Sequence, residues 1–377
     1  MDFRFLGLAL QGARSNFGTL GSPYKLNFAI TMNCQSRCTM CNIWQLKPKG
    51  ELTIEEIREF ASKNRSFRWL AITGGEPFLR SDIAEIARAF NDSSKGLYMI
   101  TIATNSLCNH DVVVKRMGEI LALRVPKVVV TLSLDGNRET HDMVRGVPGN
   151  YDRVIALYRA LKELSKTYRN LSVVLGYTIS AANQGHLQET FESVKKDLPG
   201  ITYNDFHINV AQLSNNYYHN VGGGVIPDGS AVCKDLEAVQ AGRRRGFGLM
   251  QITEGRFLDG LMAFVKTGRP PLRCRSLDAS LFLDSTGNIY PSIMWDAPVV
   301  NIRDMGYDLT KVWRGEKAAG MRRLIREGRD PVHWTSCEAY QSIIGSMLHA
   351  PRRNPRSGPA VSAAYGQRPS EVSDRGK

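Results

Sequence analysis

Residues 31–44 read T-M-N-C-Q-S-R-C-T-M-C-N-I-W, which places Cys34, Cys38 and Cys41 on one short segment with C-x3-C-x2-C spacing. The segment follows the apolar stretch 26–30, which is typical of a buried strand. Three thiolates on one loop can bind three irons of a four-iron cluster, and the fourth iron is then left open to chemistry. A structural zinc knuckle and unrelated buried thiols are the alternatives, and the grouping of three cysteines after one strand disfavours both.

Further polar or glycine-rich segments follow, each where an apolar stretch ends. They are Gly74-Gly75-Glu76-Pro77 after 68–73, Thr104-Asn105 after 99–103, Ser133-Leu134-Asp135-Gly136 at the end of 127–134, and then His141-Asp142 and Arg145-Gly146. A lone Gly-Gly followed by Pro would be an ordinary turn signal. In this order, after the cysteine loop, the segments resemble the radical S-adenosylmethionine (SAM) superfamily over about residues 24–210.

The resemblance implies one site-differentiated [4Fe-4S] cluster on the three cysteines and a SAM molecule bound to its open iron. It implies cofactor contacts from Met40, Gly74, Gly75, Glu76, Pro77, Thr104, Asn105, Ser133, Asp135 and Arg145. Met40 stands where the family often has an aromatic residue, and a thioether can fill that space against adenine. An electron from a reductant such as flavodoxin or ferredoxin would cleave SAM, and the 5′-deoxyadenosyl radical would take a hydrogen atom from a peptide or small-molecule substrate.

Strand-like and helix-like segments alternate along the chain, which is typical of a parallel sheet with crossover helices. We expect an α/β fold with a partial (β/α)6 TIM-like barrel and a small α+β extension at its carboxyl end. The expected strands are 24–30, 68–73, 97–103, 127–134, 171–180 and 204–210. Thr53 and Glu56 form a capping-box pattern at the start of the first crossover helix. The expected parts are a helical segment at 1–22, the barrel at 23–235, the extension at 236–348 and a disordered basic tail at 349–377.

Alternation along the strands predicts which side chains face the barrel lumen. Thr131 and Ser133 share one face of the fourth strand, and the apolar residues between them share the other. In the sixth strand His207 and Asn209 face the lumen, and we name them as candidate catalytic residues. Imidazole titrates near neutrality, so that His207 could donate a proton or contact the substrate. The alternative is a structural network, because buried polar groups need partners.

The extension resembles the auxiliary-cluster domain called SPASM, or its shorter form twitch, but most of its thiols are replaced. Ser292, Asp330 and His333 stand at cysteine positions, and only Cys274 and Cys337 remain. We favour a degenerate site without a second cluster. The alternatives are a cluster on Cys274, His333 and Cys337, and a zinc ion held by the two thiolates and the histidine with Asp330 as a fourth ligand.

Composition limits the remaining possibilities. The chain has 377 residues and a formal net charge of +13. No run of 18 apolar residues predicts a membrane span. The odd number of seven cysteines, three of them grouped, fits a reducing cytoplasm. Nucleic-acid binding is disfavoured because basic residues are not interleaved with aromatic ones. A non-catalytic iron–sulfur protein that transfers electrons or scaffolds a partner is the alternative function.

Overall fold

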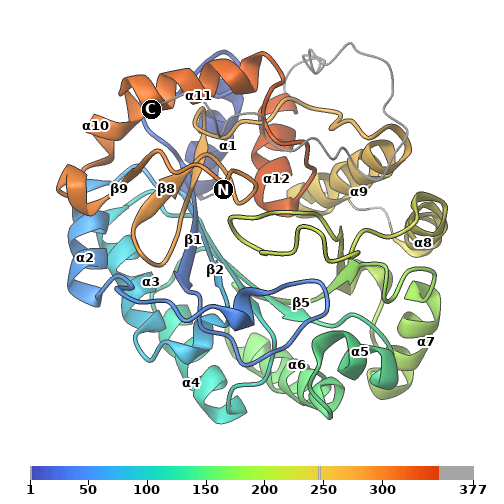
Figure 1. The fold of residues 1–377 in the computed structure, drawn as a ribbon. Helices are drawn as coiled ribbons and strands as arrows, with labels where there is room; N and C mark the ends of the chain where they lie inside the picture. The colour runs from blue at the N-terminus through green and yellow to red at the C-terminus, as the bar shows by residue number, and fades with distance from the viewer. Residues whose placement is uncertain (1, 245, 247, 348–377) are drawn as a thin grey trace.

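The computed structural model describes residues 2–244, 246 and 248–347, and the expected tail at 349–377 lies outside the described residues. Six parallel strands stand side by side in the order β6-β5-β4-β3-β2-β1 (Figure 1). They are β1 (Lys25–Thr31), β2 (Trp69–Gly74), β3 (Met99–Thr104), β4 (Lys127–Ser133), β5 (Leu171–Ile179) and β6 (Phe206–Val210). The expected α/β fold with a partial barrel is confirmed.

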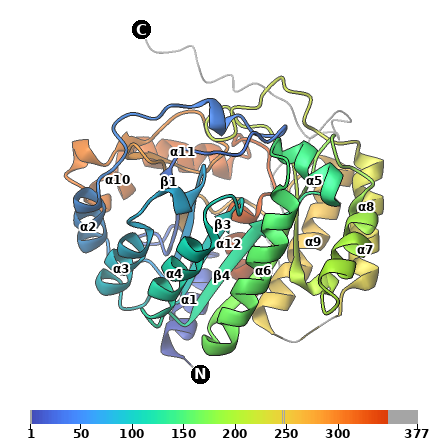
Figure 2. The ribbon, with the colours of Figure 1, turned by 90° about the horizontal axis from the view of Figure 1, so that it is seen from below.

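Crossover helices cover the outer face of the strands (Figure 2). They are α2 (Ile54–Lys63), α3 (Ile83–Ser93), α4 (His110–Leu121), α5 (Arg138–Arg145), α6 (Asn150–Thr167) and α7 (Leu187–Asp197). The predicted capping box is present, because Thr53 accepts from the Glu56 backbone and Glu56 accepts from the Thr53 backbone. Val128, Val130 and Leu132 pack in the core beneath these helices, as the alternation predicts.

The extension continues the barrel sheet instead of standing apart from it. Its strand β7 (Ser280–Leu283) pairs in parallel with β1, and β8 (Asn288–Tyr290) and β9 (Val300–Asn301) follow as antiparallel neighbours. Helix α8 (Gly229–Gly242) crosses the expected boundary at residue 236, and the helices that follow it are α9 (Leu249–Thr267), α10 (Leu309–Trp313), α11 (Glu316–Arg326) and α12 (Ser336–Ser346). The predicted hairpin and short helix are confirmed, whereas the direct pairing of β7 with the barrel was not foreseen.

Two helices from the extension stand on the open side of the barrel, between β6 and β1. Figure 1 shows α12 between α9 and β1. The Trp334 indole N–H donates to the Phe257 carbonyl at 3.0 Å and so ties the start of α12 to α9. At the foot of the barrel α1 (Phe3–Arg14) packs on α12, where Gly12 lies so close that a Cβ would stand 2.4 Å from Ile344 Cγ2. The lumen therefore has a wall on this side that the six strands do not provide.

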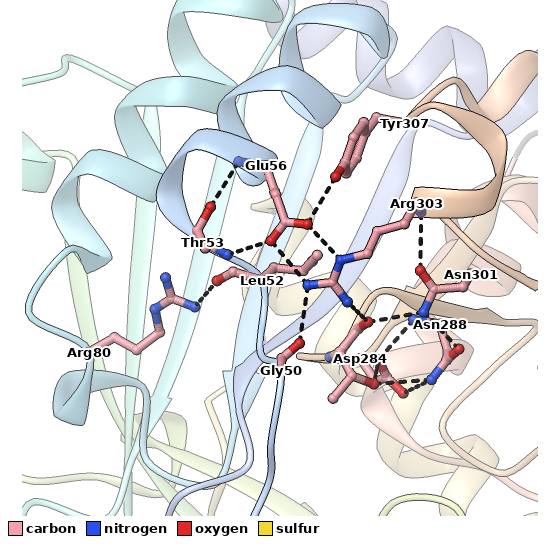
Figure 3. A network of polar contacts seen from close by, with 11 residues as sticks. Gly50, Leu52, Thr53, Glu56, Arg80, Asp284, Asn288, Asn301, Arg303 and Tyr307 are labelled. Atoms are coloured by element: carbon pink, nitrogen blue, oxygen red, sulfur yellow. Dashed lines mark hydrogen bonds and ion pairs between the residues drawn. The ribbon is translucent and has the colours of Figure 1, made fainter.

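A polar network docks the hairpin on the barrel (Figure 3). Glu56 accepts from Arg303 Nε at 2.6 Å and Nη2 at 3.0 Å, and from the Tyr307 hydroxyl at 2.9 Å. Arg303 also donates to the carbonyls of Gly50 and Thr286. The hydrogen bond from Arg303 lowers the pKa of Glu56 to about 2. One carboxylate thus caps α2 and holds the extension.

Among residues 2–244, 246 and 248–347, no helix is both long and apolar enough to cross a membrane.

Candidate functional site

A cavity of about 720 Å³ runs along the barrel lumen. At the carboxyl ends of the strands it is lined by Cys34, Cys38, Met40, Cys41, Gly74, Gly75, Thr104, Asn105, Ser133 and Arg145. His207 and Asn209 of β6 line it farther along the lumen, where His207 meets Tyr340. At the strand starts it reaches Lys25, Trp69 and Met99. The structure thus brings most of the predicted site residues to one end of a single cavity. Glu76, Pro77 and Asp135 are not part of the described wall.

The carboxyl end of α5 holds the cysteine loop. The N–H groups of Arg37 and Thr39 donate to the carbonyls of Arg145 and Val144 at 3.0 and 2.9 Å. They satisfy carbonyls that the last turn of a helix leaves without partners. Gly146 ends α5 with φ of 63°, and a Cβ there would lie 2.6 Å from the Arg37 carbonyl oxygen. The close approach of loop and helix therefore requires glycine.

The three thiols face the cavity with hydrogen-bond donors around them. Arg145 Nη1 lies 3.5 Å from Cys38 Sγ, and Asn105 Nδ2 lies 3.6 Å from Cys34 Sγ. Burial raises the pKa of Cys34 to about 11 and that of Cys41 to about 12. A bound cation would offset that cost and hold the thiolates. Three soft ligands on one loop, with donors aimed at the sulfurs, fit an iron–sulfur cluster.

The segment after β2 packs directly beneath the cysteine loop. The N–H of Gly75 donates to the Thr31 carbonyl and that of Glu76 to the Asn33 carbonyl, both at 2.8 Å. Gly74 has φ of 137°, and a Cβ there would stand 2.0 Å from the Thr31 oxygen. The two glycines therefore let the backbone reach both the loop and the cavity.

Glu76 lies behind the cavity wall. It is fully buried, and its carboxylate accepts from the Phe78 N–H, the Thr104 hydroxyl and the Asn105 N–H at 3.1, 2.9 and 2.7 Å. Burial raises the pKa of Glu76 to about 7, although these three donors favour the ionised form. The sequence placed Glu76 on the cofactor, whereas the structure places it where it orients Thr104 and Asn105.

Asp135 likewise lies under the wall. It is fully buried, forms an ion pair with Arg145 and accepts from the Thr178 N–H at 2.8 Å. The sequence also placed this carboxylate on the cofactor. In the structure it orients the Arg145 guanidinium, which reaches the cavity and Cys38.

His141 and Asn150, which were not among the predicted site residues, connect Asp135 to Asn105 through hydrogen bonds. His141 Nδ1 accepts from the Asp135 N–H at 2.9 Å, so that Nε2 carries the proton and donates to Asn150 Oδ1 at 3.0 Å. Asn150 Nδ2 in turn donates to the Asn105 carbonyl at 3.0 Å. Burial lowers the pKa of His141 to about 3, so the ring is neutral at physiological pH. His141 stood in the sequence motif, but nothing in the sequence pointed to Asn150.

A second polar cluster lines the opposite wall. Asn209 Nδ2 donates to His207 Nε2 at 2.9 Å, and His207 Nδ1 donates to Glu254 at 3.0 Å. The Tyr340 hydroxyl donates to the other Glu254 oxygen and lies 3.2 Å from His207 Nδ1. Although burial opposes ionisation, His207, Tyr340 and Arg243 hold the pKa of Glu254 below its ordinary value. The sequence identified His207 and Asn209 but missed Glu254 and Tyr340, which come from the distant helices α9 and α12.

The residues that we considered as ligands of a second metal site in the extension do not all lie together in the structure. Ligand atoms of Cys274, Asp330 and His333 all lie within 4.8 Å of one another. Cys337 is not in that group and instead lines the lumen cavity. Ser292 is buried and its hydroxyl accepts from the Met294 N–H at 3.2 Å. Among the described residues, the set of Cys274, His333 and Cys337 expected of a second cluster is therefore not assembled.

Comparison with known proteins identifies the domain in which these residues lie. The family model described as the Radical SAM superfamily matches residues 28–193. The chain carries a radical SAM domain. The matched residues include the cysteine loop, the segment 74–77 and the ion pair of Asp135 with Arg145. The family implies a [4Fe-4S] cluster and SAM.

Individual relatives share this domain. The chain is 30% identical over 192 residues to the AdoMet-dependent heme synthase of Methanosarcina barkeri, which covers 50% of this chain and 51% of the relative. It is 29% identical over 167 residues to the pre-heme d1 synthase of Dinoroseobacter shibae, with coverages of 42% and 37%. The chain thus spans about half of the length of the first relative and less than half of the second.

A solved structure shows the same fold over a larger share. Streptococcus suis SuiB bound to S-adenosylmethionine aligns with a TM-score of 0.57 and 18% identity, over 81% of this chain and 68% of SuiB.

Proposed function

We propose that this protein cleaves SAM reductively and uses the resulting radical to remove a hydrogen atom from an organic substrate in the lumen. The observation that carries the proposal is the meeting of three loop thiols, the backbone of 74–75 and the Arg145 guanidinium at one end of one cavity. When bound, the reduced cluster supplies the electron that cleaves SAM, and the barrel residues bind, orient and shield.

The three thiols would hold the cluster, and neighbouring groups would hold SAM. Arg145 is a fixed cation at the cavity wall because Asp135 pairs with it, and it can receive the carboxylate of the methionyl group. Gly74 and Gly75 expose backbone at the cavity, and Thr104, Asn105 and Ser133 offer polar groups for the nucleoside. Met40 also lines the cavity and can lie against adenine.

Glu76, Asp135, His141 and Asn150 act as positioning residues in this proposal. Their hydrogen bonds fix the turn at Thr104-Asn105 and the guanidinium of Arg145. Because buried polar groups with all partners present are rigid, the cofactor edge is preorganised.

The substrate would lie between the cofactor edge and the cluster of His207, Asn209, Glu254 and Tyr340. We assign the ring proton of His207 to Nδ1, because the Glu254 carboxylate can only accept, and this leaves Nε2 as the acceptor for Asn209 Nδ2. A donor group of the substrate can replace the Asn209 amide at Nε2, and the imidazole can then orient that group or accept its proton. Arg243 and Lys162 border the cavity as cations and can receive substrate carboxylates. A tetrapyrrole with carboxylate side chains is the first substrate class to test, because two relatives are named as heme and pre-heme d1 synthases.

The test is anaerobic reconstitution followed by reduction with dithionite in the presence of SAM. We expect 5′-deoxyadenosine, formed faster when a substrate is present. A deuterated tetrapyrrole should transfer deuterium into 5′-deoxyadenosine, and a peptide substrate would give the same transfer from a labelled peptide. If reduced, iron-loaded protein forms no 5′-deoxyadenosine, the chain is a non-catalytic iron–sulfur protein.

A variant test separates binding from chemistry at the second polar cluster. His207→Asn should lower turnover with substrate about 100-fold, the scale of a lost acid or base, and leave uncoupled SAM cleavage unchanged. His186→Asn, at the exposed N-cap of α7, is the matched control. Equal turnover in both variants would remove His207 from the catalytic set.

A further inference from the structure

Cys274, Asp330 and His333 meet at a place that the radical chemistry does not use. Cys274 lies between α9 and β7, whereas the other two lie between α11 and α12. Their sulfur, carboxylate oxygen and imidazole nitrogen atoms lie within 4.8 Å of one another. None of the three lines the lumen cavity among the described residues.

We propose that these three side chains bind one divalent transition-metal ion, with zinc as the best match. A thiolate, an imidazole and a carboxylate are the zinc ligands of proteins, and a tetrahedral site with such bonds spaces its ligand atoms about 3.5 Å apart. Side-chain movements of about 1 Å would therefore bring the observed group to bonding geometry. Magnesium and calcium prefer oxygen ligands alone, and a four-iron cluster would need more thiolates than the single one here.

The hydrogen bonds around Cys274 hold its side chain in place as a thiol. The Ser276 N–H donates to Cys274 Sγ at 3.4 Å, and the Cys274 thiol donates to the Ser276 hydroxyl oxygen at 3.0 Å. That hydroxyl donates in turn to the buried Glu338 carboxylate at 3.0 Å. Burial and the carboxylates of Asp330 and Glu338 raise the pKa of Cys274, so that an incoming ion must displace the thiol proton. Such second partners fix the position of a metal ligand. His333 is buried, whereas Cys274 is partly exposed, so that an ion can reach the group from the side of Cys274. A water would supply the fourth ligand of a tetrahedral ion.

The position of the site gives the ion a structural role. It would join the chain before β7 to the chain before α12. That helix carries Tyr340 of the lumen and Gln341, which accepts from the buried Lys25 ammonium of β1 at 3.0 Å. A metal bridge at the start of α12 would therefore hold the helix that closes the lumen.

Elemental analysis of the full-length protein tests this proposal independently of SAM cleavage, because zinc and iron are counted separately. After incubation with zinc and removal of the excess, we expect about one tightly bound zinc per chain. Cys274→Ser and His333→Asn should each reduce zinc to background and leave iron unchanged. Cys233→Ser on α8 and Cys337→Ser on α12 should both keep the zinc. Zinc retained in the first two variants, or absent from the parent protein, overturns the proposal.

Cobalt provides a measurement that does not depend on how well the variants fold. Added to the zinc-free parent protein, Co²⁺ should give a thiolate-to-cobalt charge-transfer band, which one equivalent of zinc should abolish. Cobalt spectra that show oxygen ligands alone would mean that Cys274 does not bind the ion, and they would overturn the site as proposed.

Discussion

The two groups of cysteines in this chain behave differently. Cys34, Cys38 and Cys41 lie on one loop and reach one cavity together. Cys274 and Cys337 come from distant segments of the extension, and the structure directs the first toward Asp330 and His333 and the second into the lumen. Ligands close in sequence stay together because one loop carries them, whereas ligands distant in sequence depend on how helices dock.

The structural elements that hold the two groups of cysteines in place also differ: local ones hold the loop, and distant ones hold the extension group. The cysteine loop is held by backbone hydrogen bonds to α5 and to the segment after β2, and a buried network fixes those elements in turn. The extension group depends on the placement of α12 against α9 and β1. Variants can therefore test whether each group owes its position to its own local structure or to the docking of distant elements.

The largest effect should come from the loop itself. Substitution of Cys34, Cys38 or Cys41 by Ala should reduce iron from about four atoms per chain to background and abolish SAM cleavage, because no other described thiol lies on the loop. Iron analysis and visible absorbance after anaerobic reconstitution measure this. Cys233→Ala is the control. Full iron in a loop variant would show that the cluster lies elsewhere.

The next effect tests the buried support behind the loop. Glu76→Ala leaves the Thr104 hydroxyl and two backbone N–H groups without their acceptor, and each unsatisfied group costs about 1 to 3 kcal/mol. We expect a loss of stability of about 3 kcal/mol and weaker SAM binding with the iron retained. Denaturant unfolding and equilibrium dialysis of SAM measure the two effects.

Glu55→Ala, at an exposed position on α2, is the matched control for Glu76→Ala. Unchanged SAM affinity in the Glu76 variant would show that the turn at Thr104-Asn105 needs no such support.

The sequence predicted the barrel because each strand is an apolar stretch that ends in a polar or glycine-rich segment. The six strands follow from those apolar stretches, and the lumen face of β4 follows from the alternation of polar and apolar residues along it. The capping box of α2 could also be predicted, because Thr53 and Glu56 interact across one helical turn. These features depend on residues near one another in the chain.

Features that depend on distant residues could not be predicted. The sequence placed Glu76 and Asp135 at the cofactor, since a motif names residues without showing which way a side chain turns. Asn150, Glu254 and Tyr340 join their networks only through the docking of α6, α9 and α12. The pairing of β7 with β1 also brings together segments far apart in the chain.

A smaller effect tests the docking of the extension. Glu56→Gln removes the ion pair with Arg303 and should cost about 1 kcal/mol, because both side chains are partly exposed to water. The hydrogen bond from Arg303 holds the pKa of Glu56 near 2, below its ordinary value of 4.5, although burial opposes this shift. Its contribution is therefore complete above about pH 5.5 and is lost as the pH falls through 4.5 toward 2.

The measurement is denaturant unfolding of the parent and Glu56→Gln proteins between pH 3 and 7. The two stabilities should converge at low pH and separate as the pH rises. Glu55→Gln, one residue away and more exposed, should follow the parent at every pH. A constant difference between the parent and Glu56→Gln would mean that the carboxylate does not contribute through its charge.

The smallest effect is expected when the two cysteines of the extension are replaced and the result is compared with that of the loop variants. Changing both Cys274 and Cys337 to Ser should leave iron near four atoms per chain and SAM cleavage nearly unchanged, since these thiols do not meet in the structure. The hairpin and helix around them bury Leu281, Ile289 and Trp313, so that the fold of the extension does not depend on iron. Iron analysis of the parent protein and of the double variant measures whether a second cluster is present. About eight irons in the parent, falling to about four in the variant, would mean that docking does assemble a second cluster from distant thiols.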